Sequence, residues 1–261
     1  MAHLPRVLTT RPLAQADRLL QPLAAAGYTA VNIPLLAIEP LPVSPQQKQW
    51  LLDLDCYHRV VVISPSAAEQ LLEVLDDFWP QWPVGVQWYT VGAGTRQRLE
   101  QAGIVAECPL TGDRSEDLLA LDALQDLSGQ RVLLVKGEGG RPLLEQALVE
   151  RGARVDVLPL YQRVKPRLKL EQLQDLLTGD YPVMVVTSGE GLEQYLEFAQ
   201  QYLPSAEQVK QLQQQRWLLL PSHRLVRQAE TLGFQQLICT EGAGAEAILD
   251  SLQQLQRLAT D

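Results

Sequence analysis

Six short segments of this chain combine hydroxyl, glycine and basic residues directly after apolar runs that resemble strands. They are Thr9–Arg11, Ser64–Ser66, Gly92–Thr95, Lys136–Gly140, Thr187–Gly189 and Ser222–Arg224. In parallel α/β sheets, ligands bind beyond the carboxyl ends of the strands. A helical pattern follows each segment, and the free N–H groups and dipole of a helix N-terminus favour anions. Six such segments together would suit a large anion that bears several carboxylates.

Each segment also has a simpler interpretation, because serine and threonine at these positions commonly cap the helix that follows. For any one segment taken alone, capping is the favoured interpretation. Tyr161 differs from the six segments, because it follows an apolar strand and precedes no helix. Its ring either faces a ligand or packs at a domain junction with its hydroxyl in water. The sequence leaves both alternatives open.

Several other chemistries fit the sequence poorly. Gly92 and Gly94 form only part of a dinucleotide-binding pattern, because Gln97 occupies the third glycine position. The glycine-rich segment 136–141 lacks the Gly-Lys-Ser/Thr ending of a nucleotide P-loop. Ser222 and His223 are adjacent and no Gly-x-Ser-x-Gly elbow is present, which argues against a hydrolase triad. Scattered cysteines and only three histidines predict that the protein has no metal site.

Composition narrows the range of partners. The chain has 22 Lys and Arg against 31 Asp and Glu, a net charge of −9, which argues against binding nucleic acid or anionic membranes. It contains no run of about 18 apolar residues that could cross a membrane. Its N-terminus has no apolar stretch typical of a signal peptide. We therefore expect a cytoplasmic protein, and we expect local charge at the ligand site to be neutral or positive despite the acidic total.

The elements that must position these residues are predicted by an internal repeat. Residues 6–35 and 131–160 align without a gap, with nine identities that include Arg6/Arg131, Gly27/Gly152 and Pro34/Pro159. Weaker similarity relates 60–73 to 183–197 and 90–104 to 220–234. A repeat this long exceeds the roughly 20–50 residues of solenoid units. It predicts two similar domains, and the interface between domains is a common place for a ligand site.

Strand-like and helical patterns alternate along the chain, which predicts parallel sheets covered by helices on both faces. Segments 36–45 and 161–170 carry prolines and show no helical pattern, so they are expected to be extended linkers. Two domain layouts remain open from periodicity alone. Either the halves fold in order and divide near 126–130, or the chain leaves the first domain at residue 36 and returns to it near 165.

An ordered set of motifs covers nearly the whole chain and resembles the uroporphyrinogen-III synthase family. The motifs are VLTTRP, ISPSA, VGAGT, LLVKGEGGRPLL, LPLYQRV, VTSGEGL and LGF followed by TEGAGAEAILDSL. The resemblance implies an α/β fold of two similar domains, each a parallel sheet flanked by helices, joined by a two-stranded antiparallel linker. Domain one would comprise 1–35 and 168–261, domain two 42–160, and the linkers 36–41 and 161–167.

The same resemblance implies a lyase of porphyrin (haem) biosynthesis that acts on hydroxymethylbilane, a linear tetrapyrrole with eight carboxylates. The reaction releases water, inverts ring D and closes the macrocycle through an azafulvene and a spiro-pyrrolenine. No cofactor or metal is implied, and nothing in the sequence requires more than a monomer. The family is thought to act chiefly by folding and holding its substrate with main-chain N–H groups.

Site residues follow from the matched motifs. Tyr161 would be the catalytic residue that aids departure of the hydroxyl, because a neutral phenol can donate to a leaving oxygen. The predicted substrate-binding residues are Thr10, Arg11, Ser64, Gly92, Thr95, Lys136, Gly137, Thr187, Ser188 and Ser222. Arg141 and Arg163 are further candidates for pairing with carboxylates. The sequence departs from the family at Pro221–Arg224, where many members have a Gly-Pro-x-Thr-like turn, and Leu225 occupies the threonine position.

A second hypothesis belongs to a different functional class. Two similar domains could also form a non-catalytic binding protein for a small polyanionic ligand. Catalysis separates the two hypotheses, because a binding protein would not change which macrocycle isomer forms.

Overall fold

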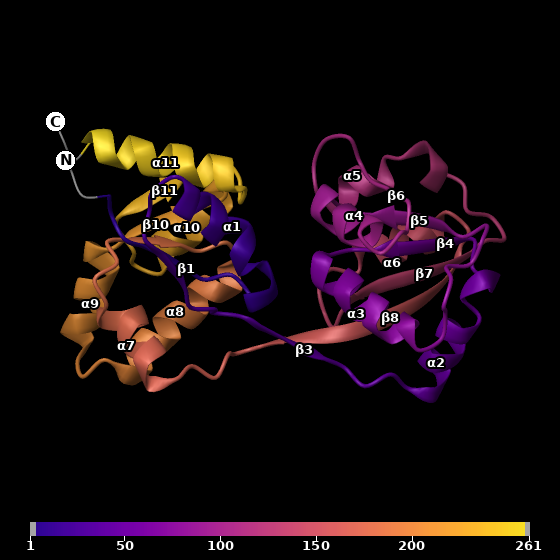
Figure 1. Ribbon diagram of the computed structural model, residues 1–261, viewed down its shortest axis with the longest axis horizontal. Helices are drawn as coiled ribbons and strands as arrows, with labels where there is room; N and C mark the ends of the chain where they lie inside the picture. Colours follow the sequence, from indigo (N-terminus) through magenta and orange to yellow (C-terminus); the bar gives the residue numbers. More distant parts are fainter. Residues whose placement is uncertain (1–3, 259–261) are drawn as a thin grey trace. The chain divides into compact units, whose positions relative to one another are not determined.

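A computed structural model describes residues 4–258 of the 261-residue chain. The chain forms two compact units (Figure 1). Unit 1 comprises Met1–Ala37 and Val164–Asp261, and unit 2 comprises Ile38–Arg163. The chain therefore leaves unit 1, builds unit 2 and then returns to complete unit 1.

Unit 1 contains a five-stranded sheet with the strand order β11-β10-β9-β1-β2, and each neighbouring pair is parallel. Its strands are β1 (Val7–Thr9), β2 (Ala30–Asn32), β9 (Val183–Val185), β10 (Trp217–Leu220) and β11 (Leu237–Cys239). Its helices are α1 (Leu13–Ala25), α7 (Leu170–Thr178), α8 (Gly189–Tyr202), α9 (Ala206–Gln215), α10 (His223–Thr231) and α11 (Ala245–Leu258).

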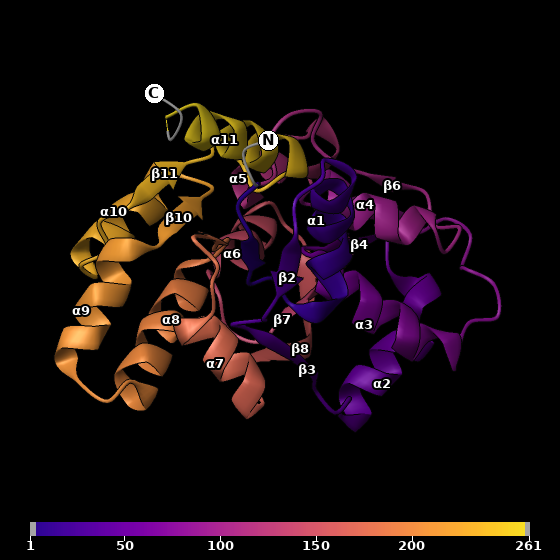
Figure 2. The ribbon, with the colours of Figure 1, turned by 60° about the vertical axis from the view of Figure 1, so that its left-hand side comes forward.

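Helices cover both faces of the unit 1 sheet. α1 and α11 lie side by side on one face, as Figures 1 and 2 show, and their leucines pack on Val7, Val183 and Val185. Residues of α7, α8, α9 and α10 pack on the other face, against Leu8 and Met184. Alternate strand residues thus point into two cores, which explains why these strands are continuous apolar runs.

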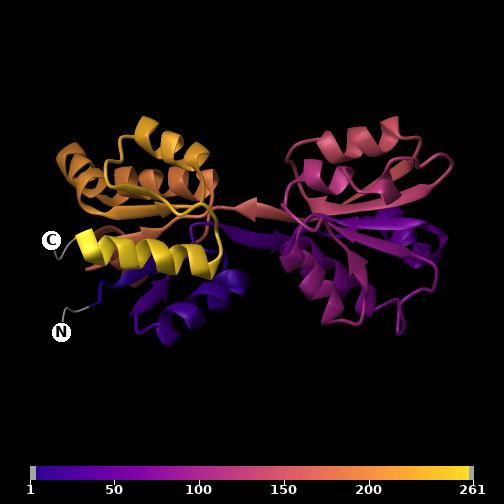
Figure 3. The same cartoon turned by 90° about the horizontal axis from the view of Figure 1, so that it is seen from above.

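Unit 2 contains a six-stranded sheet with the strand order β3-β8-β7-β4-β5-β6. Its strands are β3 (Ala37–Pro40), β4 (Arg59–Val62), β5 (Gln87–Thr90), β6 (Ala106–Glu107), β7 (Arg131–Gly137) and β8 (Arg154–Val164). Its helices are α2 (Pro45–Leu52), α3 (Pro65–Asp76), α4 (Ala93–Glu100), α5 (Ser115–Leu119) and α6 (Leu143–Glu150), with 3-10 turns at Leu54–Cys56 and Asp122–Leu124. α3 and α4 pack on one face, and α5 and α6 on the other (Figure 3).

The predicted fold class is confirmed, because the two sheets have the same architecture. Taken from one edge, β11-β10-β9-β1-β2 of unit 1 corresponds to β6-β5-β4-β7-β8 of unit 2, and β3 is an added strand. The repeat aligns β1 and α1 with β7 and α6. Gly27 and Gly152 end the two helices with φ of 86° and 91°, a left-handed conformation that glycine adopts without steric cost.

Strands β3 and β8 cover parts of the two segments that were expected to be extended linkers. β3 and β8 are neighbours in the unit 2 sheet, and the Leu41 N–H donates to the Leu160 carbonyl at 2.8 Å. β8 runs through Tyr161 to Val164, so Tyr161 is part of the sheet of unit 2. Pro159 lies inside this strand, beside a register shift between Lys136 and Gly137 of β7, and a strand tolerates proline at such an irregularity.

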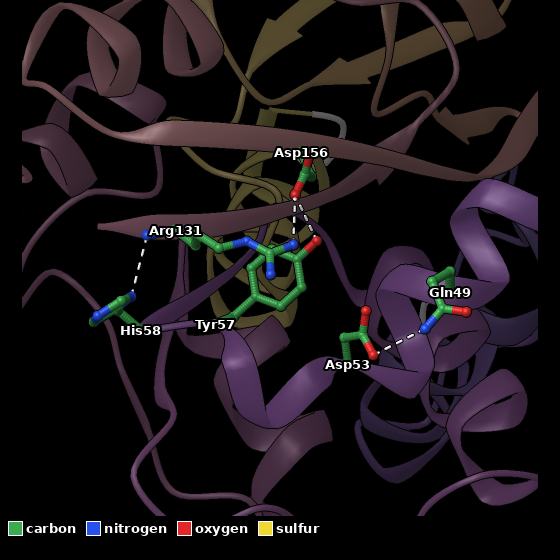
Figure 4. Close-up of polar contacts among 6 residues, drawn as sticks. All are labelled: Gln49, Asp53, Tyr57, His58, Arg131 and Asp156. Atoms are coloured by element: carbon green, nitrogen blue, oxygen red, sulfur yellow. Dashed lines mark hydrogen bonds and ion pairs between the residues drawn. The ribbon is translucent and has the colours of Figure 1, made fainter. Parts of the chain in front are cut away.

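A polar cluster stabilises the amino ends of the unit 2 strands (Figure 4). The Tyr57 hydroxyl donates to Asp156 Oδ2 at 2.7 Å, and Arg131 Nη2 approaches the same oxygen at 3.2 Å. The Arg131 guanidinium lies 4.4 Å from the Tyr57 ring centroid, and its main-chain N–H donates to His58 Nδ1. This cluster is at the edge opposite the predicted ligand-binding loops, so we assign it a structural role.

Because Tyr57 can ionise, we expect the contribution of this cluster to the free energy of unfolding to depend on pH. Burial, and then the hydrogen bond to Asp156, raise the pKa of Tyr57 well above its ordinary value of 10.0. The unfolded chain therefore loses the phenolic proton first, so Tyr57 stabilises the fold fully below about pH 10 and less as pH rises further. Tyr57→Phe should cost about 1.5–3 kcal/mol at pH 8 through loss of the hydrogen bond to a carboxylate. By calorimetry, the difference in free energy of unfolding between wild type and Tyr57→Phe should be constant below about pH 10 and should narrow as pH rises above it. A difference that stayed constant above about pH 10 would contradict the assignment.

Candidate functional site

In unit 1 the parallel register brings five predicted site residues to one edge of the sheet. Thr10 and Arg11 follow β1, Thr187 and Ser188 follow β9, and Ser222 follows β10. Because β1, β9 and β10 are parallel, the carboxyl ends of all three strands lie at the same edge. The unit therefore gathers these residues as the rule for α/β sheets predicts.

Arg11 is a cationic group at this edge. One Nη atom donates to the Ala243 carbonyl in the loop before α11. The Nε atom is buried and has no hydrogen-bond partner among the described residues. Burial, and then the nearby Arg18 guanidinium, lower the pKa of Arg11. A partly desolvated guanidinium with a spare donor is suited to pair with a carboxylate.

The Asn32 side chain fixes the main chain at Arg11. Asn32 was not among the site residues predicted from the sequence. Its side-chain oxygen accepts from the Thr9 hydroxyl at 2.6 Å and from the Arg11 N–H at 3.1 Å, while its amide donates to the Arg11 carbonyl. Asn32 ends β2, the strand beside β1, so the rule that selected the other loops also applies to it. The loop after β2, residues 33–36, has none of the hydroxyl, glycine or basic residues that mark the other loops.

The hydroxyl groups of unit 1 differ in what they offer a ligand. Thr10 is buried and donates to the Val185 carbonyl at 3.0 Å, so its hydroxyl is already used within the fold. Ser188 caps α8 and Ser222 caps α10, each accepting a main-chain N–H from the first turn. A capping serine still has its own O–H proton, so Ser188 and Ser222 can both cap a helix and donate to an anion. Leu225, in the first turn of α10, is buried in the core.

In unit 2 the corresponding edge carries the remaining predicted residues. Ser64 follows β4 and caps α3, accepting the Ala67 N–H at 3.1 Å. Gly92 occupies the capping position of α4, and Thr95 is buried in the first turn of that helix. Lys136 is half-buried near the end of β7, and Gly137 ends that strand.

Tyr161 reaches across the middle strand of three to contact Ser64. The order β8-β7-β4 separates their strands by β7, yet Tyr161 Oη lies 3.0 Å from Ser64 Oγ. Gly137 is the β7 residue in register with Tyr161, and a Cβ added to it would lie 2.5 Å from the ring. The absence of a side chain at Gly137 therefore makes room for the contact. Tyr161 is only 2% exposed, and its ring belongs to the hydrophobic core of unit 2.

The loops at this edge of unit 2 carry charged side chains of both signs. Arg141 pairs with Glu116 at 2.8 and 3.4 Å, and this bond lowers the pKa of the Glu116 carboxyl. Asp113 lies against Gly92, with its Cβ 3.2 Å from the position that a Gly92 Cβ would take. Both Nη atoms of Arg141 are bonded to Glu116. Arg141 must therefore break these bonds before both atoms can bind a carboxylate of a ligand.

Residues 4–258, which the structure describes, contain neither a metal-binding cluster nor a membrane-spanning helix. No group of three or more His, Cys, Asp or Glu side chains there could hold a metal ion. No helix in the same range is long and apolar enough to span a membrane.

The fold and these edges define a two-domain α/β protein with hydroxyl, main-chain and cationic groups at the carboxyl ends of its strands. The family model described as Uroporphyrinogen-III synthase HemD matches residues 17–250. The chain therefore belongs to the uroporphyrinogen-III synthase family of tetrapyrrole biosynthesis.

Individual relatives agree with this assignment. The uroporphyrinogen-III synthase of Salmonella typhimurium is 30% identical over 257 residues, covering 95% of this chain and 99% of the relative. That of Escherichia coli matches with the same identity and coverage. The solved uroporphyrinogen-III synthetase of Helicobacter pylori has a TM-score of 0.61 at 13% identity, covering 96% of this chain and 99% of its own. A Thermus thermophilus uroporphyrinogen III synthase has a TM-score of 0.57 at 19% identity, covering 97% and 99%. These two structures support the fold alone.

Proposed function

We propose that this chain is a cyclising lyase that converts hydroxymethylbilane to uroporphyrinogen III, inverting ring D and releasing water. The observation that carries most weight is the near-complete match to a relative of this name, which covers 95% of this chain and 99% of the relative. Every residue that the proposal uses is supplied by one chain, so we propose a monomer as the working form.

The loops of both units suit the substrate, which bears eight carboxylates. In unit 1 the unpartnered Nε of Arg11 and the O–H groups of Ser188 and Ser222 are available donors. In unit 2 the α4 N-terminus at Gly92 and the half-buried Lys136 are further donors. Main-chain N–H groups at helix N-termini bind anions without a charged side chain, which reconciles the acidic net charge with a polyanionic substrate.

Tyr161 is proposed to protonate the leaving hydroxyl. The C–O bond of the hydroxymethyl group breaks, its electrons leave with oxygen, and the oxygen takes the phenolic proton to depart as water. The pyrrole N–H of the same ring loses a proton as the azafulvene forms, and this proton can restore the phenol. A neutral phenol in a largely buried position is suited to donating one hydrogen bond in this way.

The alternative is a non-catalytic protein that binds a polyanion through the same donors. The two are separated by incubating purified protein with freshly generated hydroxymethylbilane, oxidising the products and separating type I from type III uroporphyrin. The linear substrate closes unaided to type I. A binding protein would leave type I dominant, whereas the proposed enzyme makes type III dominant.

A further inference from the structure

The hydroxyls of Ser64 and Tyr161 are in contact, and each of the two residues is also held by further neighbours. Ser64 Oγ lies 3.0 Å from Tyr161 Oη and also accepts the Ala67 N–H at 3.1 Å. Tyr161 and the buried face of α3 belong to the same hydrophobic core. Gly137 lies against the ring, with Tyr161 Cζ 2.5 Å from the position of an added Cβ.

The hydrogen bond between Ser64 and Tyr161 can have either of two directions. The pair has two hydroxyl protons and one mutual hydrogen bond, so one proton lies in the bond and the other points away. If Tyr161 donates, the outward proton belongs to Ser64. If Ser64 donates, the outward proton is the phenolic one. An aryl hydroxyl is the stronger acid of the two, so the second arrangement presents the better proton donor to a ligand.

We propose that Ser64 is a positioning residue that donates to Tyr161 Oη and thereby directs the phenolic proton toward the leaving oxygen of the substrate. This inference rests on the proposed function and changes the role expected of Ser64, which was direct substrate binding. It assigns the two residues different tasks, since Tyr161 touches the reacting oxygen and Ser64 acts through Tyr161.

The surroundings of Ser64 favour this role as the reaction proceeds. When Tyr161 gives up its proton, negative charge develops on Oη, and the Ser64 O–H is already directed at it. Ser64 in turn receives the Ala67 N–H at the N-terminus of the 12-residue helix α3, where the helix dipole is positive. A donor fixed before the charge appears stabilises that charge without reorganising. The proton that the pyrrole N–H later loses returns to Oη and closes the cycle.

The inference is tested with Ser64→Ala, Ser64→Thr, Tyr161→Phe and the Ser64→Ala/Tyr161→Phe double variant. Ser44→Ala is the matched control, because Ser44 also caps a helix of unit 2 but has no tyrosine partner. We expect Ser64→Ala to lower kcat for type III formation about 10-fold to 100-fold with KM unchanged, as for loss of a hydrogen bond to a developing charge. Ser64→Thr should restore most of kcat, and Ser44→Ala should keep it.

The double variant provides the decisive comparison. If Ser64 acts through Tyr161, Ser64→Ala should cost nothing further in the Tyr161→Phe background. A raised KM with unchanged kcat, or a full additional loss in the double variant, would overturn the inference and return Ser64 to direct binding. Wild-type protein that makes only type I would instead remove the proposed function, so the two failures are distinguishable.

Discussion

Replacing Tyr161 with phenylalanine is expected to lower kcat for type III formation by about 100-fold to 10,000-fold, the range for removing a positioned general acid. The change deletes one oxygen from a ring that is 2% exposed and leaves its packing intact. KM should change little, because the phenol is proposed to act on the leaving oxygen and not on the carboxylates. Steady-state kinetics with separation of the isomers measures both quantities.

The control for Tyr161→Phe is a measurement showing that the variant is still folded. Loss of the 3.0 Å bond to Ser64 should reduce the free energy of unfolding by only about 1 kcal/mol, so the circular dichroism spectrum should match wild type. A kcat within about twofold of wild type would mean that Tyr161 supplies no proton, even if the chain remained an active synthase.

Gly137→Ala is expected to damage both activity and stability. The added methyl would lie 2.5 Å from Tyr161 Cζ and 2.7 Å from Cε2, closer than packed carbons approach. Because the ring is buried, it must shift and break its contact with Ser64. Overpacking of this kind costs about 1–3 kcal/mol, and misplacing a reacting group by about 1 Å can cost roughly 100-fold in rate. Thermal unfolding and kcat measured on the same preparation test both effects.

Gly139→Ala is the matched control in the same loop. Gly139 has a φ of 72°, and an added Cβ would meet nothing within 4 Å. Its alanine variant therefore carries backbone strain of about 1 kcal/mol without a collision with the ring. Gly139→Ala should keep kcat near wild type. Equal losses of kcat in the two variants would show that the loop, and not the Tyr161 ring, responds to substitution.

The architecture was largely predictable because it is repeated. The residues shared by 6–35 and 131–160 predicted that β1 and β7 are equivalent, and both take the same place in their sheets. The alternation of strand-like and helical patterns predicted parallel sheets covered by helices. Ser64, Ser188 and Ser222 were identified at strand ends, and all three prove to be helix caps.

The contacts inside the site were not predictable, because they depend on strand order. Ser64 and Tyr161 are 97 residues apart, and only the order β8-β7-β4 brings their hydroxyls together. The need for glycine at position 137 follows from the same order, since its strand lies between the other two. The strand that leads to Tyr161 was expected, but its passage through Pro159 depends on a register shift in the neighbouring strand β7, which the sequence does not show. The ion pair between Arg141 and Glu116 joins residues 25 positions apart, and no sequence pattern predicted it.

The central claim is that this chain turns over hydroxymethylbilane to the inverted macrocycle, and product analysis at substoichiometric protein tests it most directly. Wild-type protein and Tyr161→Phe would each be given a large excess of freshly generated substrate, and type I and type III uroporphyrins would be quantified after oxidation. We predict that wild type forms type III in large molar excess over protein, and that the variant leaves mostly type I. Type I alone from folded wild-type protein would contradict the proposed function and favour a polyanion-binding protein.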